Sequence, residues 1–198
     1  MGQPEGSGSD YIRTFVAIRL PERLHKHFRD FTQLAYFKQK GFRPIKPENA
    51  HITLHFLGDT KKSELPLMIS ALEEAVVGVG PYNLSLTGAY AFPHHLDASI
   101  YWARPGNEVD RIYQLRSNVL RELSVYLEPE DLEVNFVPHI TIAKYKSGTL
   151  SAEYRKELVT CLQVEVSQRN LDWNVNSIEL IHSDRDEYVT LAEIPFKY

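Results

Sequence analysis

Two copies of the tripeptide His-Ile-Thr are the part of this sequence best suited to chemistry. The first, at residues 51 to 53, lies in the segment PENAHITLHFLG, and the second, at 139 to 141, lies in VPHITIAKY. A buried imidazole or hydroxyl without a hydrogen-bonding partner costs about 1 kcal/mol or more. An ordinary buried strand would therefore carry Val, Ile or Leu at such positions. The repetition indicates that the two polar pairs have one common explanation.

Strand geometry separates the polar residues of each copy from the apolar ones. Residues two apart on a β-strand point to the same face. His51 and Thr53 therefore share one face, and Ile52 lies on the other. His139 and Thr141 pair in the same way. Each segment is thus expected to form the floor of a cleft.

Two imidazoles across a cleft provide a general acid and a general base, because histidine titrates near neutral pH. Two hydroxyls beside them donate hydrogen bonds without adding negative charge. This set suits a phosphodiester: one histidine activates a nucleophile, the other protonates the leaving oxygen, and the hydroxyls hold the phosphate oxygens. Metal-free phosphoryl transfer of this kind is sufficient when a ribose hydroxyl is the nucleophile or leaving group. The alternative is a pair of core histidines with local hydrogen-bonding partners.

The surrounding pattern predicts the elements that position these residues. Apolar periodicity predicts helices over residues 21–41, 65–76 and 107–127 and near 151–161. Besides the two histidine segments, β-branched and aromatic runs predict strands at 13–20, 82–92, 98–104, 173–183 and 187–196.

The order of these elements repeats along the chain, with an offset of 88 residues between the two histidines (139 − 51). We therefore predict an α+β fold made of a duplicated, two-lobed unit, with antiparallel sheets facing a central cleft and helices on the outside. The pseudo-repeats are expected at about 21–104 and 107–196. They would form one bilobal domain over residues 11–198, after a flexible tail at residues 1–10.

Composition narrows the class of protein. The 198 residues are 43% hydrophobic and 24% charged, as in an ordinary globular domain. The net charge of −4 provides no global basic field for nucleic acid, so phosphate recognition must be local. Cys161 is the single cysteine, which excludes an internal disulfide and suits a cytoplasmic protein. No apolar run approaches the roughly 18 residues that a membrane span requires.

The paired motifs at this separation resemble those of the 2H (two-histidine) phosphoesterases. The longer segments PENAHITLHFLG and PHITIAKY look like the bacterial RNA 2',3'-cyclic phosphodiesterase branch, also known as 2'-5' RNA ligase, and FVAIRLP is similar to its first strand. The resemblance covers roughly residues 13–196. It implies a bilobal fold with the active site between the lobes. It also implies hydrolysis of a terminal 2',3'-cyclic phosphate to a 2'-phosphate.

The resemblance also implies a role for each motif residue. By motif position, His51 would protonate the departing 3' oxygen, and His139 would activate water. Thr53 and Thr141 would bind the phosphate. In the reverse, ligating direction the two histidines would exchange roles.

Two positions near the motifs, Lys144 and His55, depart from the family pattern. In that branch an Arg often stands three residues after the second threonine, where this chain has Lys144, which lacks the bidentate fork. Strict alternation turns Lys144 away from His139, so it reaches the phosphate only if the strand twists, bulges or ends there. His55 shares the predicted face of the first pair, and we expect it at the rim of the cleft, with substrate contact as the alternative. Phe56 is expected to pack on the apolar face.

Other side chains are candidates for binding. A nucleobase needs an aromatic platform, and the rings predicted near the cleft edges are Phe42, Tyr90, Phe92 and Tyr145. The basic residues that could supply cleft cations are Arg13, Arg43 and Lys46. His94 and His95 lie in a turn-like segment and are expected to be exposed. Neither HExxH nor a paired Cys/His spacing occurs, so we expect no metal site and no cofactor.

Several functions fit the motifs. The first is an enzyme acting on RNA ends or nucleotides with a 2',3'-cyclic phosphate. A second keeps the chemistry but acts on 2'-5' linked oligoadenylate, or joins 2'-5' RNA ends reversibly. A third class, a non-catalytic RNA-end binding protein, would be better served by Arg or Lys than by two histidines. We expect a monomer that binds RNA or an oligonucleotide and no membrane.

Overall fold

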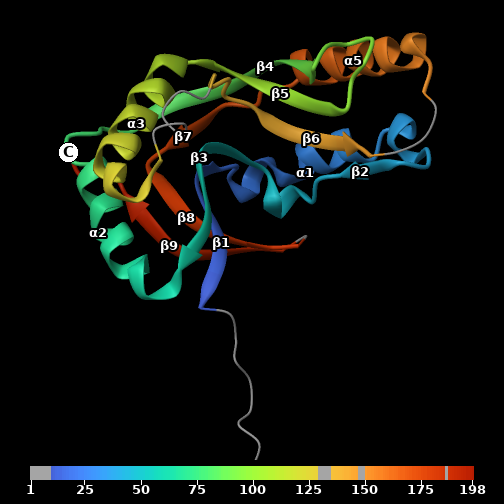
Figure 1. The fold of residues 1–198 in the computed structure, drawn as a ribbon. Helices are drawn as coiled ribbons and strands as arrows, with labels where there is room; N and C mark the ends of the chain where they lie inside the picture. The colour runs from blue at the N-terminus through green and yellow to red at the C-terminus, as the bar shows by residue number, and fades with distance from the viewer. Residues whose placement is uncertain (1–9, 129–134, 147–149, 186) are drawn as a thin grey trace, which may run out of the picture.

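A single antiparallel sheet runs through the part of the chain that this computed structural model describes, residues 10–128, 135–146, 150–185 and 187–198 (Figure 1). Its strands are β1 (Tyr11–Arg19), β2 (Phe42–Pro44), β3 (His51–Lys61), β4 (Tyr82–Phe92), β5 (Ile100–Asn107), β6 (Ile140–Tyr145), β7 (Trp173–Val175), β8 (Ser177–Asp184) and β9 (Glu187–Pro195). The strand order is β7-β4-β5-β6-β3-β1-β8-β9, and β2 pairs with β6. Apart from Asp10, the tail predicted at residues 1–10 lies outside the described residues.

The helices follow the predicted apolar stripes but differ in length. They are α1 (Glu22–Thr32), α2 (Leu65–Ala75), α3 (Val109–Glu122) and α5 (Ala152–Ser167), with short 3-10 turns η1 (Ala35–Lys38), η2 (Pro47–Asn49), η3 (Lys62–Glu64) and η4 (Ser124–Tyr126). The prediction that the first helix reaches residue 41 is wrong. The backbone becomes extended at Leu34, which lets Phe37 pack under Phe42 with ring centroids 5.2 Å apart. The last helix is longer than predicted, and its Ser151 cap accepts a hydrogen bond from the amide of Tyr154.

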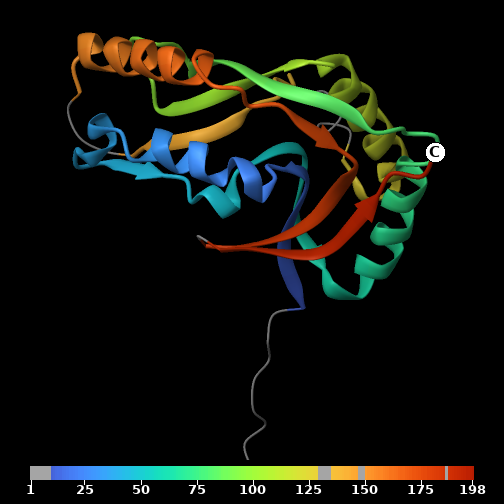
Figure 2. The ribbon, with the colours of Figure 1, turned by 180° about the vertical axis from the view of Figure 1, so that it is seen from behind.

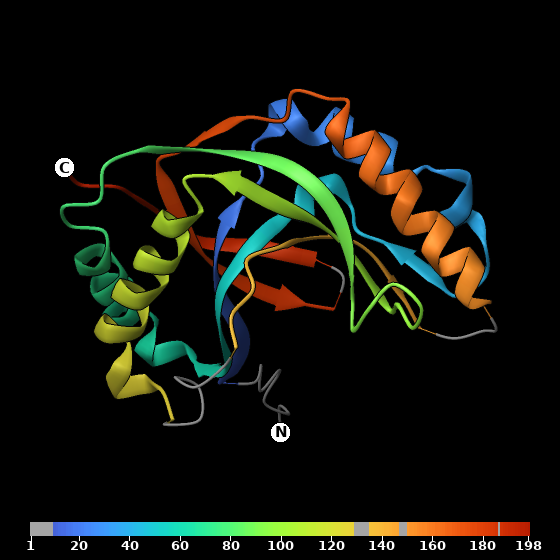
Figure 3. The same cartoon turned by 90° about the horizontal axis from the view of Figure 1, so that it is seen from above.

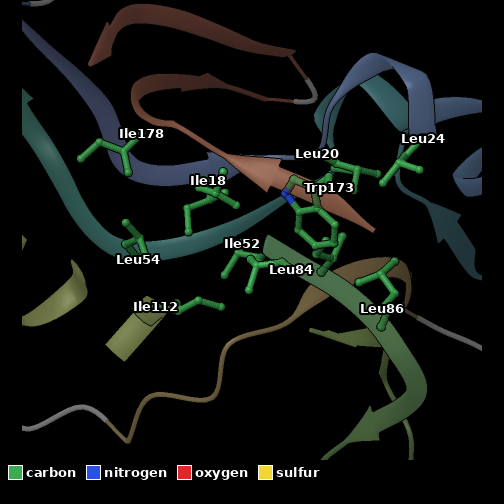
Figure 4. Close-up of a cluster of buried hydrophobic side chains, with 14 of the residues drawn as sticks. Ile18, Leu20, Leu24, Ile52, Leu54, Leu84, Leu86, Ile112, Trp173 and Ile178 are labelled. Carbon is green, nitrogen blue, oxygen red and sulfur yellow. The ribbon is translucent and has the colours of Figure 1, made fainter. Parts of the chain in front are cut away.

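The core lies between the sheet and the helices. Each helix buries one stripe, and α1 contributes Leu24, Phe28 and Phe31. Figure 4 shows side chains from strands of both halves of the sheet and from α1 and α3 converging there. The labelled residues are Ile18, Leu20, Leu24, Ile52, Leu54, Leu84, Leu86, Ile112, Trp173 and Ile178, and each is at most 6% exposed. Burying a side chain of this size contributes about 1.5–3 kcal/mol.

The sheet has two wings that meet where β3 lies beside β6. One wing reads β3-β1-β8-β9 and the other β6-β5-β4-β7. The wings are covered on the outside by helix pairs, with α2 beside α3 and α1 near α5 (Figures 2 and 3). The predicted α+β class with outer helices is therefore confirmed. The two predicted sheets are hydrogen-bonded into one, because β3 and β6 pair directly.

The 88-residue offset also matches the order of the wings. Adding 88 to the bounds of β1 gives residues 99–107, which overlap β5, and β5 lies beside β6 just as β1 lies beside β3. We infer that the repeat unit begins with β1 and with β5. Each unit would then begin one strand earlier than the predicted ranges 21–104 and 107–196.

Candidate active site

The two His-Ile-Thr segments meet at the centre of the sheet. Ile52 of β3 pairs antiparallel with Ile140 of β6, and His139 directly precedes β6. Continued by one residue in each direction, this register sets each histidine opposite the threonine of the other segment. The two motifs are thus related by a local two-fold arrangement around one pair of isoleucines.

Both polar pairs face a cavity of about 320 Å³. The two isoleucines between them are fully buried on the other face, as alternation predicts. The residues that line the cavity are Ile45, Asn49, His51, Thr53, Phe56, Phe92, Ile100, His139, Thr141, Lys144 and Tyr188. The structure therefore brings together all five residues that the sequence analysis assigned to catalysis and phosphate binding.

Backbone carbonyls hold the two imidazoles in the same way. His51 Nδ1 lies 2.6 Å from the carbonyl oxygen of Asn49, and His139 Nδ1 lies 2.8 Å from that of Val137. A carbonyl only accepts, so each Nδ1 carries the hydrogen and each Nε2 has the lone pair in the neutral ring. His51 Nε2 in turn accepts a hydrogen bond from the Thr53 hydroxyl at 3.0 Å. Each Nε2 is thereby the atom available for proton transfer.

The surroundings favour the neutral form of both rings. Burial lowers the pKa of His51 to about 4, although the bond to Asn49 opposes the shift. The charges of Arg19, His139 and Lys144 contribute to the same lowering of the pKa. Burial also lowers the pKa of His139, and Lys144 adds to that effect, while the bond to Val137 opposes it. A phosphate anion in the cavity would act in the opposite direction, because negative charge stabilises an imidazolium.

A β-bulge follows the threonine in each motif. In the β1–β3 ladder, Ala17 pairs with Thr53 and Val16 with His55, which leaves Leu54 unpaired. In the β5–β6 ladder, Trp102 pairs with Thr141 and Tyr101 with Ala143, so the residue between those two is skipped in the same way. One extra residue reverses which face the following side chains point to.

Because of these bulges, the predicted faces of His55 and Phe56 are wrong. The bulge in β6 also meets the condition under which Lys144 was predicted to reach the phosphate. His55 was expected on the face of His51 and Thr53, but it is only 6% exposed and lines an adjoining cavity of about 210 Å³ instead of the main one. Phe56 was expected to pack on the apolar face, but it is 67% exposed and lines the cavity. Lys144 reaches the cavity because the bulge turns it to the face of His139. Phe56 and Lys144 occupy the same place in the two motifs, three residues after the threonine.

Of the four predicted aromatic platforms, one lines the cavity. Phe92 lies edge-on to His139 with centroids 5.3 Å apart. Tyr90, 39% exposed, stacks on Trp102 beside the cavity. Phe42 and Tyr145 pack against each other at 4.9 Å and against the core, so they are not at the cleft. Both rings lie on the face of the sheet that packs against the core, because β2 and β6 direct these two side chains to that face.

Among the other candidates, Arg43 and Lys46 line a neighbouring cavity, while Arg13 lies exposed on β1 and lines none of the cavities described here. His94 and His95 are exposed, as predicted.

Two residues beside His51 were not predicted from the sequence. The ring of Phe15 lies 4.8 Å from His51, and Tyr188 contacts it edge-on at 5.4 Å. Tyr188 comes from β9, far along the chain. No motif or periodic pattern in the sequence indicates this contact, because it depends on how β9 joins the sheet beside β8.

An ion-pair network supports the turn that holds His51. Arg19 Nε lies 3.0 Å from Glu179 Oε2, and a second nitrogen of its guanidinium donates to the carbonyl of Glu48 at 2.7 Å. Thr190 also bonds both Arg19 and Glu179. Because Glu48 precedes Asn49, this network fixes the carbonyl that orients His51.

Comparison with known proteins agrees with this geometry. A family model described as the 2'-5' RNA ligase superfamily matches residues 20–187. An RNA 2',3'-cyclic phosphodiesterase of Methanothermobacter thermautotrophicus is 28% identical over 156 residues, which cover 78% of this chain and 83% of that protein. The protein of the same name from Aquifex aeolicus is 29% identical over 173 residues, covering 87% and 88%.

Solved structures share the fold. A protein of Thermus thermophilus superposes with a TM-score of 0.72 at 22% identity, covering 94% of this chain and 98% of its own. E. coli LigT complexed with phosphate gives a TM-score of 0.67 at 19% identity, covering 96% and 100%. At these identities the likeness concerns the fold alone.

Within the described ranges, no group of three or more His, Cys, Asp or Glu residues is arranged to hold a metal ion. No helix of those ranges is long and apolar enough to cross a membrane.

Proposed function

The chain belongs to the 2'-5' RNA ligase superfamily, and from this premise we propose that it hydrolyses the 2',3'-cyclic phosphate ends of RNA or nucleotides to 2'-phosphates. The relatives named RNA 2',3'-cyclic phosphodiesterase support this substrate. The matched region covers more than four-fifths of the length of both relatives.

One observation carries the proposal: two imidazoles line one cavity, each with Nδ1 bound to a carbonyl and Nε2 available for proton transfer. A threonine hydroxyl accompanies each imidazole, and Lys144 adds a positive charge. This set provides an acid, a base and donors for phosphate oxygens.

The reaction follows from these roles. His139 Nε2 accepts a proton from water as the water oxygen attacks phosphorus. The bond between phosphorus and the 3' oxygen breaks, and His51 Nε2, protonated beforehand, gives its proton to that oxygen. The products are a 2'-phosphate and a free 3' hydroxyl. Thr53 and Thr141 donate hydrogen bonds to the non-bridging oxygens, and Lys144 balances their charge as it redistributes.

This assignment requires substrate to change the protonation of His51. Burial, together with the nearby cations Arg19 and Lys144, holds its pKa at about 4. The negative charge of the bound phosphate must raise that pKa for His51 to carry a proton at neutral pH. The direction of this effect is favourable, because the phosphate lies against the imidazole that must be charged.

The test is an assay of a short RNA ending in a 2',3'-cyclic phosphate, with and without chelator, with products identified by mass and phosphate position. We expect a 2'-phosphate in both cases. His51→Ala and His139→Ala should each lose about two orders of magnitude or more in rate. His94→Ala, which removes an exposed histidine of a turn, is the matched control.

Other outcomes separate the alternatives. Cleavage of a 2'-5' oligoadenylate without turnover of the cyclic end would keep the two-histidine chemistry and change the substrate. Tight binding of the RNA end with no product from either substrate would overturn the enzyme proposal in favour of a binding protein.

A further inference from the structure

The catalytic cavity continues into a second, cationic cavity. This second cavity, of about 220 Å³, is lined by Arg43, Pro44, Ile45, Lys46, Asn49 and Tyr188. Three of these residues, Ile45, Asn49 and Tyr188, also line the catalytic cavity. The two are therefore parts of one groove, whose outer part we call the cationic end.

Positive charge is concentrated at the cationic end. Arg43 of β2 lies directly opposite Lys144 of β6. Lys46 follows on the same segment and lines the same cavity as Arg43. The whole chain has a net charge of −4, so this is a local feature. The charges of Arg43 and Lys46 favour an anion in this cavity.

The opposite end of the groove is aromatic. A cavity of about 210 Å³ shares Thr53, Phe56 and His139 with the catalytic cavity and includes Phe136, over whose ring the Arg116 guanidinium lies at 4.8 Å. This is the aromatic end. Aromatic rings that line a groove in this way offer stacking surfaces to nucleobases.

The two ends lie in opposite directions along the central strands. From Asn49, the chain enters β3 at the cationic end and reaches Phe56 at the aromatic end. The antiparallel β6 segment runs from Val137 at the aromatic end to Lys144 beside the cationic end. His51 is thus nearer the cationic end, and His139 lines the cavity of the aromatic end.

The groups of a nucleotide with a 2',3'-cyclic phosphate follow the same order as the groove: an aromatic base, the cyclic phosphate, and an anionic 5' phosphate. C1', which carries the base, adjoins C2'; C4', which leads to the 5' phosphate, adjoins C3'. Base and 5' phosphate therefore diverge to opposite sides of the cyclic phosphate. With the base at the aromatic end, the 3' oxygen faces His51 and the 5' phosphate faces Arg43 and Lys46.

We propose that Arg43 and Lys46 bind the phosphate on the 5' side of the terminal nucleotide, so that the protein prefers the ends of RNA chains to cyclic mononucleotides. This inference rests on the proposed function and names its substrate more narrowly. It also accounts for the orientation in which His51, rather than His139, protonates the 3' oxygen.

Three substrates test it: a nucleoside 2',3'-cyclic phosphate, the same compound carrying a 5' phosphate, and a dinucleotide ending in the same cyclic phosphate. We expect kcat/KM for the second and third to exceed that for the first by about tenfold or more, because charge-assisted hydrogen bonds to phosphate are strong. The advantage should shrink as ionic strength rises.

The double variant R43Q/K46Q should lose most of that preference. Its kcat/KM should fall much more for the two substrates that carry a phosphate on the 5' side than for the nucleoside 2',3'-cyclic phosphate without one. The charge-conserving R43K/K46R should keep most of it. The matched control R13Q/K61Q removes two charges from β1 and β3 residues that line neither end, and it should keep the preference in full.

Equal kcat/KM for all three substrates in the wild type, or a preference that survives R43Q/K46Q, would overturn the inference while leaving the proposed function in place. Failure of the wild type to hydrolyse even the mononucleotide and the RNA end would instead remove the proposed function. Circular dichroism and melting temperature confirm that each variant is folded.

Discussion

At the scale of single residues, the two histidines are prepared for proton transfer by the same device. Each Nδ1 hydrogen is held by the carbonyl two residues earlier in the chain, so each ring is fixed in tautomer and in orientation. Burial and nearby cations then lower the pKa of both rings. The pair therefore loses its protons at lower pH than free imidazoles do.

The pH dependence of kcat/KM should reflect this shift. Catalysis needs one protonated and one neutral imidazole, and kcat/KM reports the free enzyme. Because the pKa of each ring lies below its usual value of about 6.5, the singly protonated pair is most populated on the acid side of that value. We expect a bell-shaped profile with its maximum below about pH 6.5 and falling activity as pH rises, measured on a cyclic mononucleotide from about pH 4 to 9. A maximum above about pH 7.5 would contradict the effect of burial.

Lys144→Gln tests the charge that reaches the cavity through the bulge. The lysine lowers the pKa of both histidines, so its removal should raise both pKa values and move the profile to higher pH. The loss of a phosphate-binding charge should also reduce kcat/KM by about tenfold or more. Lys144→Arg should keep the position of the profile. A Gln variant with an unchanged pH profile would show that the Lys144 charge does not act on the histidines.

At the scale of elements, the limit of sequence reasoning lies at the two bulges. As far as Thr53 and Thr141, strand alternation correctly predicted the face on which each side chain lies, because that part of each strand is regular. It failed for His55 and Phe56 because nothing in the apolar pattern marks Leu54 as the skipped residue. A bulge depends on how the neighbouring strand, here β1, pairs with β3. The contact of Tyr188 with His51 likewise depends on tertiary structure.

The network of Arg19 joins β1, β8 and β9 to the turn that orients His51, and Arg19→Met should reveal that link. Displacing the Asn49 carbonyl misplaces the imidazole, for which we expect a loss of about ten- to a hundredfold in kcat. The charge of Arg19 also lowers the pKa of His51, so the pH profile should move to higher pH. A merely structural role would not produce that movement.

The matched control for this network is Arg121→Met. It breaks the ion pair with Glu122 on the surface of α3, where the Arg side chain is 65% exposed, and exposed pairs contribute little. We expect its activity and pH profile to match the wild type. Equal effects of Arg19→Met and Arg121→Met would mean that the network does not position His51.

At the scale of the whole molecule, the active site is the junction of two wings. The His-Ile-Thr repeat predicted that two segments face one cleft, and the apolar stripes predicted the outer helices. The sequence pattern did not indicate that the segments pair directly, because hydrogen bonding between strands far apart in the chain leaves no periodic signal. The pairing of Ile52 with Ile140 makes the cleft the bend of one sheet. Catalytic geometry and the packing of the wings therefore depend on the same residues.

Ile52→Ala should accordingly weaken both wings together. The side chain is fully buried, and its truncation leaves a cavity, so the free energy of unfolding should fall by about 2–5 kcal/mol. Urea unfolding followed by far-ultraviolet circular dichroism and by tryptophan fluorescence reports this loss. Trp102 and Trp173 both lie in the β6-β5-β4-β7 wing, so the fluorescence follows that wing alone. We expect the two transitions to coincide at a lower urea concentration than in the wild type.

Val189→Ala, at a half-exposed position of the edge strand β9, is the control and should leave the unfolding transition nearly unchanged. A fluorescence transition that stays at the wild-type position while the circular dichroism signal separates into two steps would show that the wings are independently stable.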